Sequence, residues 1–151
     1  MATKVTINKL AATMVAEQGV RGALIETGAR LVEKVRASMT PGTGRTYKWK
    51  GGQHTASAPD QPPAPFSRRL HDSISYHTTF GDKSSVGQEA EDGDGIKKPQ
   101  QAMGGHSVVI GTNVPYALDL EIGTKNVSMR PYLWPALKRS MADIKEAFKR
   151  Y

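Results

Sequence analysis

The sequence predicts an α+β domain in which a small antiparallel sheet packs with a long N-terminal helix and a C-terminal amphipathic helix, with long extended loops between them. Three observations predict this class. Apolar residues recur at helical spacing near both ends of the chain, short runs of β-branched or alternating aromatic residues lie in the middle, and two long stretches have no periodicity. The 151 residues are enough for a single domain, spanning 1–151, with a core of its own.

The N-terminal segment, from about Ile7 to Met39, is expected to be helical. An apolar face with helical spacing includes Leu24 and Leu31. Gly19 and Gly22 lie in the middle, and each costs about 1 kcal/mol relative to alanine, so we expect a bend or break there. The Thr-Pro-Gly-Thr-Gly run after Met39 ends the helix, because proline and glycine stop its propagation.

The next segment begins with a predicted strand and continues as an arm. Residues 45–50 alternate basic or polar side chains with Tyr47 and Trp49, which is typical of a short strand. The stretch 51–66 is rich in proline and glycine and is expected to be a loop or extended arm. Its prolines include Pro59, Pro62 and Pro63.

Two further strands are expected on either side of a second arm. Ser67 is predicted to cap a short helix from about Arg68 to Ser73, which leads into a strand from Ile74 to Phe80. The run 107–112 is rich in β-branched residues and predicts another strand. The stretch 81–105 between them has no periodicity, and connections of that length are usually functional or disordered. If the two strands pair, this stretch forms a long hairpin arm.

The C-terminal third predicts a strand, extended run or helical turn, then a glycine turn and an amphipathic helix. Pro131 suits the start of the helix, and Pro135 is expected to delay regular hydrogen bonding until just after it. The predicted apolar stripe of this helix, which is about five turns long, consists of Leu133, Leu137, Met141 or Ser140, Ile144 and Phe148.

Composition excludes several classes of protein. There is no cysteine, which rules out disulfides, thiolate nucleophiles and cysteine-based metal sites. No run approaches the roughly 18 apolar residues of a membrane span, and the N-terminus lacks the apolar segment of a signal peptide, so we expect synthesis in a cytoplasm and no membrane partner. The net charge of +7 favours contact with nucleic acid or with an acidic protein surface.

No pattern of residues predicts a metal, a cofactor or catalysis. The acidic cluster at 89–94 lacks the ligand spacing of a calcium loop, and the glycine-rich turn after Met39 lacks the lysine and hydroxyl of a phosphate loop. The histidines have no metalloenzyme spacing; they are His54, His71, His77 and His106. We therefore expect that the protein is not an enzyme.

Two sets of residues are candidates for binding. Tyr47 and Trp49, interleaved with basic residues, have the pattern of a surface that stacks on bases, or else of a strand whose aromatic face packs on a neighbour. Glu121 and Arg130 are candidates for an ion pair across the turn that contains Thr124, either within the chain or to a neighbouring subunit.

Two blocks of the sequence resemble one known family. The first block contains Gly-Arg-Thr-Tyr at 44–47, Ala-Ser-Ala-Pro at 56–59 and Leu-His-Asp-Ser-Ile at 70–74. The second contains Glu-Ile-Gly-Thr at 121–124 and Arg-Pro-Tyr-Leu-Trp-Pro-Ala-Leu at 130–137. In this order and at this distance they resemble the tail-component family of small siphophage proteins, which are head–tail connector or tail-completion proteins of lambdoid long-tailed phages.

The resemblance implies a structural protein of the virion neck or tail, made in the host cytoplasm. It implies self-association into a ring of about six subunits around the DNA channel, without sequence-specific contact to the DNA. Further implied partners are the connector, the tail terminator and the tail tube. The residues expected at subunit or partner contacts are Tyr47, Trp49, Pro59, Pro62, Pro63, Glu121, Thr124, Arg130 and Trp134. The alternative is a small basic nucleic-acid-binding protein that uses the Tyr47–Trp49 strand and the C-terminal basic face.

Overall fold

The computed structural model describes residues 9–83 and 106–151 of the chain. These residues form helices and short strands in the order α1 (Lys9–Ser38), β1 (Thr46–Trp49), β2 (Gly52–Thr55), α2 (Arg69–Ser73), β3 (Ser75–Thr78), β4 (Val108–Gly111), α3 (Ala117–Ile122) and α4 (Leu133–Arg150). The predicted α+β class is confirmed. The strands, however, form two separate antiparallel pairs rather than one sheet.

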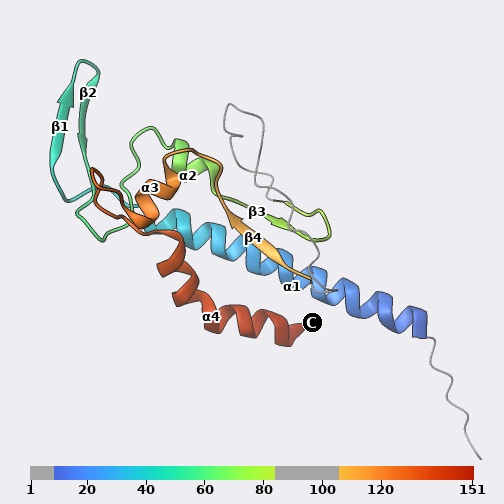
Figure 1. The fold of residues 1–151 in the computed structure, drawn as a ribbon. Coiled ribbons are helices and arrows are strands. Elements are labelled where there is room, and N and C mark those ends of the chain that lie inside the picture. Colours follow the sequence, from blue (N-terminus) through green and yellow to red (C-terminus); the bar gives the residue numbers. More distant parts are fainter. Residues whose placement is uncertain (1–8, 84–105) are drawn as a thin grey trace, which may run out of the picture.

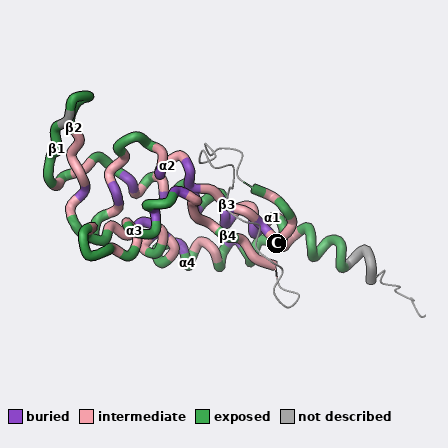
Figure 2. The backbone as a smooth tube through the Cα atoms, turned by 45° about the horizontal axis from the view of Figure 1, so that its top comes forward, coloured by how far each residue is buried: buried purple, intermediate pink, exposed green. Residues whose placement is uncertain are grey.

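Helix α1 is the central element of the fold. It contacts the β3–β4 pair on one side and α4 on the other (Figure 1). The β1–β2 hairpin projects beyond the end of α1 at one end of the molecule, and the first turns of α1 project at the opposite end. Buried residues gather between these two projections, both of which are largely exposed (Figure 2). Among the described residues, no helix has the length and apolar character to cross a membrane.

The core lies beside the C-terminal half of α1, where α2, β3, α3 and α4 meet. Its two most enclosed large side chains are Ile74, at the end of α2, and Tyr132, just before α4. The buried members of the cluster are Val32, Val35, Met39, Leu70, Ile74, Tyr76, Val114, Ala117, Tyr132 and Ala136. The core therefore joins residues from distant parts of the chain, and it includes Met39 near the base of the hairpin.

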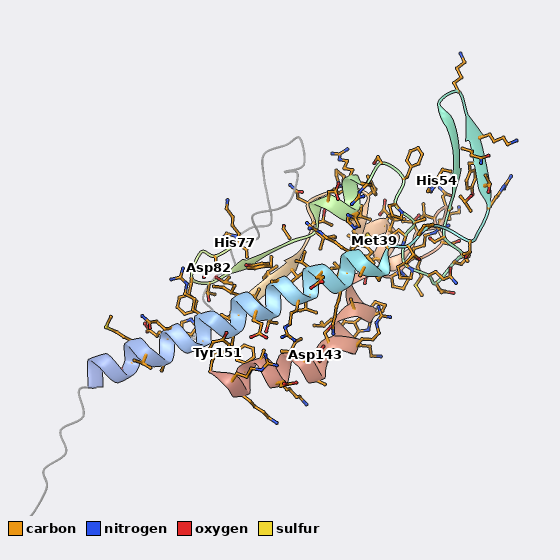
Figure 3. All side chains as sticks on the ribbon, turned by 180° about the vertical axis from the view of Figure 1, so that it is seen from behind. Met39, His54, His77, Asp82, Asp143 and Tyr151 are labelled. Atoms are coloured by element: carbon orange, nitrogen blue, oxygen red, sulfur yellow. The ribbon has the colours of Figure 1, made fainter. Side chains whose placement is uncertain are left out.

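Helix α1 runs unbroken from Lys9 to Ser38, so the predicted break near Gly19 and Gly22 is wrong. The reason is that the end of the chain packs against these glycines. A Cβ atom at Gly22 would lie 2.8 Å from the Cε1 atom of Tyr151, and one at Gly19 would lie 3.2 Å from the carbonyl oxygen of Tyr151. Figure 3 shows Tyr151 beside α1. The two glycines thus leave room for Tyr151 to lie close to the helix backbone.

Replacing Gly28 with alanine is expected to lower the free energy of unfolding by about 1 to 3 kcal/mol, because it overpacks the core. In an exposed helix the same change stabilises by about 1 kcal/mol. Here the added Cβ atom would lie 2.6 Å from Cγ of Tyr76, a residue that is 9% exposed and forms part of the core.

Gly22→Ala is the matched control for this prediction. The three atoms nearest to its Cβ atom all belong to the ring of Tyr151, a side chain that is 62% exposed and can turn away. The control is expected to be neutral or stabilising in urea denaturation. If both alanine variants changed stability by the same amount, the packing explanation for Gly28 would be wrong.

The β3–β4 pair confirms two predicted strands, which are shorter than expected. Ser75 lies opposite Gly111 and Thr78 opposite Val108 in an antiparallel register. Beyond the strands, the backbone N–H of Thr79 donates to the carbonyl oxygen of Ser107 at 3.0 Å. The predicted arm at 81–105, with its acidic cluster at 89–94, falls outside the described residues from position 84 onward.

An ion pair between Arg21 and Asp82 joins α1 to the turn after β3. The Nε atom of Arg21 donates to the carboxylate of Asp82 at 2.9 Å, and the hydroxyl of Thr78 donates to the same carboxylate at 3.1 Å. The hydrogen bond from Arg21 is the main reason why the pKa of Asp82 lies below its ordinary value. Figure 3 shows Asp82 on the side of α1 opposite to Asp143 of α4.

Two local predictions need correction, and one open alternative is decided. The stretch 51–66 is not wholly a loop, because β2 occupies its first part. Helix α2 has Arg68 at its N-cap, in a left-handed conformation with φ of 60°, and Ser67 lies one residue earlier, where its hydroxyl accepts the N–H of Arg69 at 3.4 Å. For the run after Tyr116, where a strand, an extended run or a helical turn was predicted, the structure has the short helix α3.

Candidate interaction surfaces

A groove of about 530 Å³ lies at the base of the β1–β2 hairpin. Its walls come from the hairpin, the proline-rich segment, α2 and α3, and most of its surface is apolar. The lining includes Tyr47, His54, Pro63, Phe66, Tyr116 and Arg130. We call it the hairpin groove. It brings together three of the predicted contact residues, namely Tyr47, Pro63 and Arg130.

At the base of the hairpin, the segment before β1 and the segment after β2 pass close to each other. Thr46 lies opposite Thr55 in the antiparallel register, and their hydroxyls are 2.8 Å apart. Below them, the N–H of Gly44 donates to the carbonyl oxygen of Ala56 at 2.8 Å. A Cβ atom at Gly42 would lie 2.0 Å from the carbonyl oxygen of Thr55. The glycines after α1 therefore do more than end the helix, since they let the two segments pass each other.

Aromatic rings line the hairpin side of the groove. Tyr47 is 50% exposed, and the guanidinium carbon of Arg45 lies 5.3 Å from its ring centroid. On the opposite strand, His54 meets the exposed ring of Phe66 edge-on, with centroids 4.8 Å apart. The side chain of Trp49 lies outside the described part of the structure. Sequence reasoning missed Phe66, whose only signal was an aromatic residue next to a proline run.

The proline-rich segment is held against the body rather than free. Pro63 is buried, Pro62 is half-buried and Pro59 is exposed. The backbone N–H of Asp60 donates to the carbonyl oxygen of Met129 at 2.9 Å, which ties the segment to the loop before α4. Of the two predicted alternatives for this part of 51–66, the structure has a loop held against the body and not an extended arm, whereas the hairpin itself does project.

Glu121 caps the N-terminus of α4. Its Oε2 atom accepts the backbone N–H groups of Tyr132 at 2.8 Å and Leu133 at 3.1 Å, and its Oε1 atom accepts that of Trp134 at 2.9 Å. The next residue, Pro135, has no N–H group to satisfy. One carboxylate therefore satisfies the N–H groups that a helix start leaves unpaired, and its charge lies at the positive end of the helix dipole. Helix α4 begins at Leu133, two residues after Pro131, which was predicted to lie near the helix start.

Within the chain, Glu121 and Arg130 form no ion pair, so the intrachain alternative is wrong. Arg130 instead donates from Nε to the carbonyl oxygen of Ser57 at 3.3 Å and from Nη1 to that of Ser128 at 3.1 Å. The hydroxyl of Thr124 accepts the N–H of Val127 at 3.1 Å and shapes the turn. These three predicted contact residues hold α3, the loop and the proline-rich segment together.

Tyr132 anchors the same region in the core. It is 1% exposed, and its hydroxyl donates to the carbonyl oxygen of Ala117 in α3 at 3.3 Å. Burial, followed by the negative charge of Glu121, raises the pKa of Tyr132 well above its ordinary value. The phenol is therefore a neutral packing residue.

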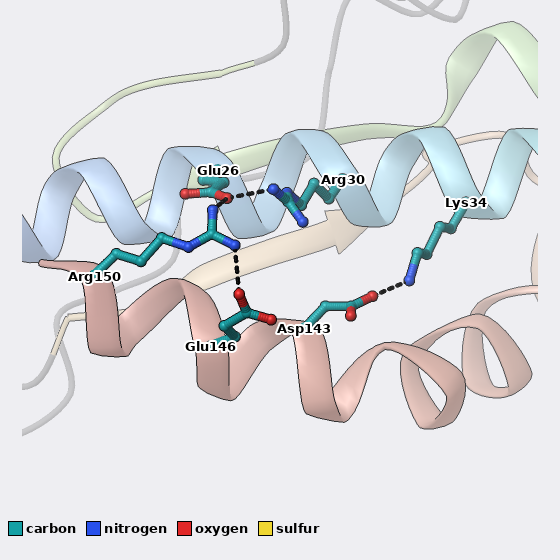
Figure 4. A network of polar contacts seen from close by, with 6 residues as sticks. All are labelled: Glu26, Arg30, Lys34, Asp143, Glu146 and Arg150. Carbon is teal, nitrogen blue, oxygen red and sulfur yellow. Dashed lines mark hydrogen bonds and ion pairs between the residues drawn. The ribbon is translucent and has the colours of Figure 1, made fainter.

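Helix α4 packs on α1 through small side chains. Its buried residues are Ala136, Ser140 and Ala147, and ion pairs at the edge of the contact join Lys34 to Asp143 and Glu26 to Arg150 (Figure 4). The predicted stripe is thus right for Ser140, partly right for the half-buried Leu133, Leu137 and Ile144, and wrong for Met141 and Phe148. Met141 and Phe148 remain exposed, as does the predicted contact residue Trp134. Small side chains allow the two helices to approach closely.

The histidines are spread over the molecule. His54 lies on the hairpin, far from His77 on β3 (Figure 3). His71 is hydrogen-bonded to Asp72 at 2.6 Å, which lowers the pKa of that carboxyl, and His106 stacks on Phe80 with centroids 4.5 Å apart. Within residues 9–83 and 106–151, no three potential metal ligands lie together.

Comparison with known proteins finds no match: no family model, no curated protein and no solved structure is significantly similar to the chain. The resemblance to tail-component proteins therefore stays a prediction from the sequence. What the described residues offer are surfaces suited to contact, namely the hairpin with its groove and the exposed apolar side chains of α3 and α4. On α3 these are Leu118 and Ile122.

Proposed function

We propose that this protein is a structural virion protein of a long-tailed bacteriophage that assembles with copies of itself into a ring at the head–tail joint or the top of the tail. The ring contains about six subunits and surrounds the DNA channel. Its other partners are neighbouring neck and tail proteins, such as the connector, tail terminator or tail tube. The two sequence blocks support a role in the phage neck or tail. The observation that supports self-assembly is the projecting β1–β2 hairpin.

The hairpin carries the proposal because it projects without a core of its own. All side chains described from Arg45 to Gln53 are exposed, and the sheet contains only these two strands. An isolated two-stranded hairpin is at best marginally stable in water, and its outer edges are templates for pairing. A hairpin of this kind is expected to gain order by lying against a neighbouring molecule.

The groove at the hairpin base supports contact between unlike surfaces. Exposed aromatic and apolar side chains on the hairpin side of the molecule, such as Tyr47 and Phe66, suit burial by another subunit. A projection that docks on a different surface of the next copy makes a heterologous contact. Such contacts close into a ring when the rotation between copies permits.

Light scattering on the purified full-length protein tests the proposal. We expect a discrete species with the mass of several subunits, formed alone or with neck partners. The double variant Tyr47→Ser/Phe66→Ser removes two exposed rings at the groove and is expected to shift this species to monomer. Val15→Ser, which removes an exposed apolar side chain near the opposite end of α1, is the control and should keep the mass. A wild-type protein that stays monomeric under all these conditions would overturn the proposal.

A second candidate is direct binding of nucleic acid, and the charge of the hairpin favours it. Arg45, Lys48 and Lys50 are exposed on the hairpin, and residues 45–55 include no acidic side chain. If this candidate is correct, the mass changes only when duplex DNA is added. The affinity then falls with salt with a slope near one per neutralised phosphate, and Lys48→Glu/Lys50→Glu weakens it.

A further inference from the structure

The outer face of α4 carries an apolar stripe that is separate from the hairpin groove. Trp134, Leu137, Met141, Ile144 and Phe148 recur at alternating spacings of three and four, and we call this set the α4 seam. The spacing is that of the a and d positions of a heptad, which pack against a second helix. Trp134, Met141 and Phe148 remain 60%, 49% and 44% exposed.

The seam does not serve the fold in the way that such a stripe usually does. Helix α4 already packs on α1 through its small residues, which lie on a different side of the helix. Leu137 and Ile144 are half-buried at the boundary between the two sides. The seam is therefore a second apolar face on a helix whose first face is occupied.

A row of lysines borders the seam on the side away from α1. At about 100° per residue, Lys138, Lys145 and Lys149 lie across the seam from the buried alanines, and all three lysines are exposed. The acidic residues of α4 have other partners, since Asp143 pairs with Lys34 and Glu146 pairs with Arg150 (Figure 4). None of the ion pairs among the described residues involves the three lysines.

The same charges argue against a second copy of α4 as the occupant. Two seams packed antiparallel would place the lysine row of each helix against that of the other, and like charges at these flanking positions are destabilising. In a parallel pair of α4 helices, the lysine row of each helix would face the side of the other helix that already packs on its own α1. The lysine row instead complements a helix with acidic flanks.

We propose that the α4 seam is the docking site for an amphipathic helix of a partner protein, whose apolar stripe is bordered by acidic side chains. Trp134, Met141 and Phe148 are the anchors, because large aromatic and methionine side chains dominate such contacts. The lysine row selects a partner helix with acidic flanking side chains. This mode of binding lays a helix along a preformed apolar face. It does not depend on whether the protein forms a ring.

A pair of synthetic peptides tests the proposal with the full-length protein. Both are helices of about three heptads with leucine at a and d, and they carry either glutamate or lysine at the flanking e and g positions. Anisotropy of the labelled glutamate peptide is expected to report binding with a dissociation constant on the order of 10 μM, whereas the lysine peptide does not bind. The charge-reversed variant Lys138→Glu/Lys145→Glu is expected to reverse this preference.

The apolar anchors and a control complete the test. Trp134→Ala/Phe148→Ser is expected to weaken binding of the glutamate peptide at least about ten-fold, while Val15→Ser leaves it unchanged. Circular dichroism checks that each variant keeps its helices. Three results would overturn the proposal: equal binding of both peptides, self-association that depends on the seam residues, or seam-dependent binding to anionic lipid vesicles without binding to the glutamate peptide.

Discussion

Replacing Tyr132 with alanine is expected to lower the free energy of unfolding by about 3 to 5 kcal/mol, the cost of removing a large buried aromatic ring. The ring is 1% exposed and belongs to the core cluster that joins α1, α2, α3 and α4. Its loss leaves a cavity where the surrounding elements come from distant parts of the chain and cannot collapse together. For a domain of this size the melting temperature is expected to fall by about 6 to 20 °C, which thermal unfolding followed by circular dichroism measures.

Tyr132→Phe is the matched control for the cavity. It keeps the ring and removes only the hydroxyl that donates to Ala117 at 3.3 Å, so it is expected to cost about 1 kcal/mol. A phenylalanine variant as unstable as the alanine variant would mean that the hydrogen bond, and not packing, holds this position.

Replacing Glu121 with alanine is expected to lower the free energy of unfolding by about 2 to 3 kcal/mol, because three backbone N–H groups lose a charged acceptor at once. Those groups belong to Tyr132, Leu133 and Trp134, and two of these residues are at least half-buried. Water can reach the N–H of Trp134 more easily than the other two. Urea denaturation gives the loss, and the helical signal should fall as the first turn of α4 frays.

Glu121→Gln separates charge from hydrogen bonding at this cap. Glutamine keeps one acceptor oxygen but loses the charge that interacts with the helix dipole, so an intermediate loss of about 1 kcal/mol is expected. Exposed Asp119 lies on the same helix, and Asp119→Ala should change stability by less than about 0.5 kcal/mol. If Glu121→Ala were as mild as Asp119→Ala, the capping role would be refuted.

The parts of the fold that follow from local patterns were predictable. The long α1, the β3 and β4 strands and the C-terminal helix each have a clear period or a β-branched run. Strand β2 was missed because Gly-Gln-His-Thr at 52–55 is polar and contains little that favours a strand. Only its pairing with Tyr47 and its neighbours in β1 makes it a strand. The glycines of α1 predicted a break because the residue that packs against them, Tyr151, is distant in sequence and gives no local signal.

The candidate sites were predicted less well, because they depend on contacts between distant residues. Glu121 was predicted as a contact residue and as a possible partner of Arg130, but within the chain it accepts hydrogen bonds from backbone N–H groups, which carry no sequence signal. The groove itself was not predicted, although Tyr47, Pro63 and Arg130 line it. On α4, the largest apolar residues suggested the buried face, whereas close packing on α1 selects Ala136 and Ala147 and leaves Met141 and Phe148 exposed.

The β3–β4 pair has a consequence for the chain between residues 83 and 106. The backbone of Thr79 is hydrogen-bonded to that of Ser107, and Phe80 stacks on His106, so the body of the domain holds both ends of that stretch at one place. Once the ends are fixed, the entropy of closing the stretch depends weakly on its length, with about 0.6 kcal/mol for each doubling. A change in the length of the sequence inserted at this position is therefore expected to leave the register of β3 and β4 unaltered.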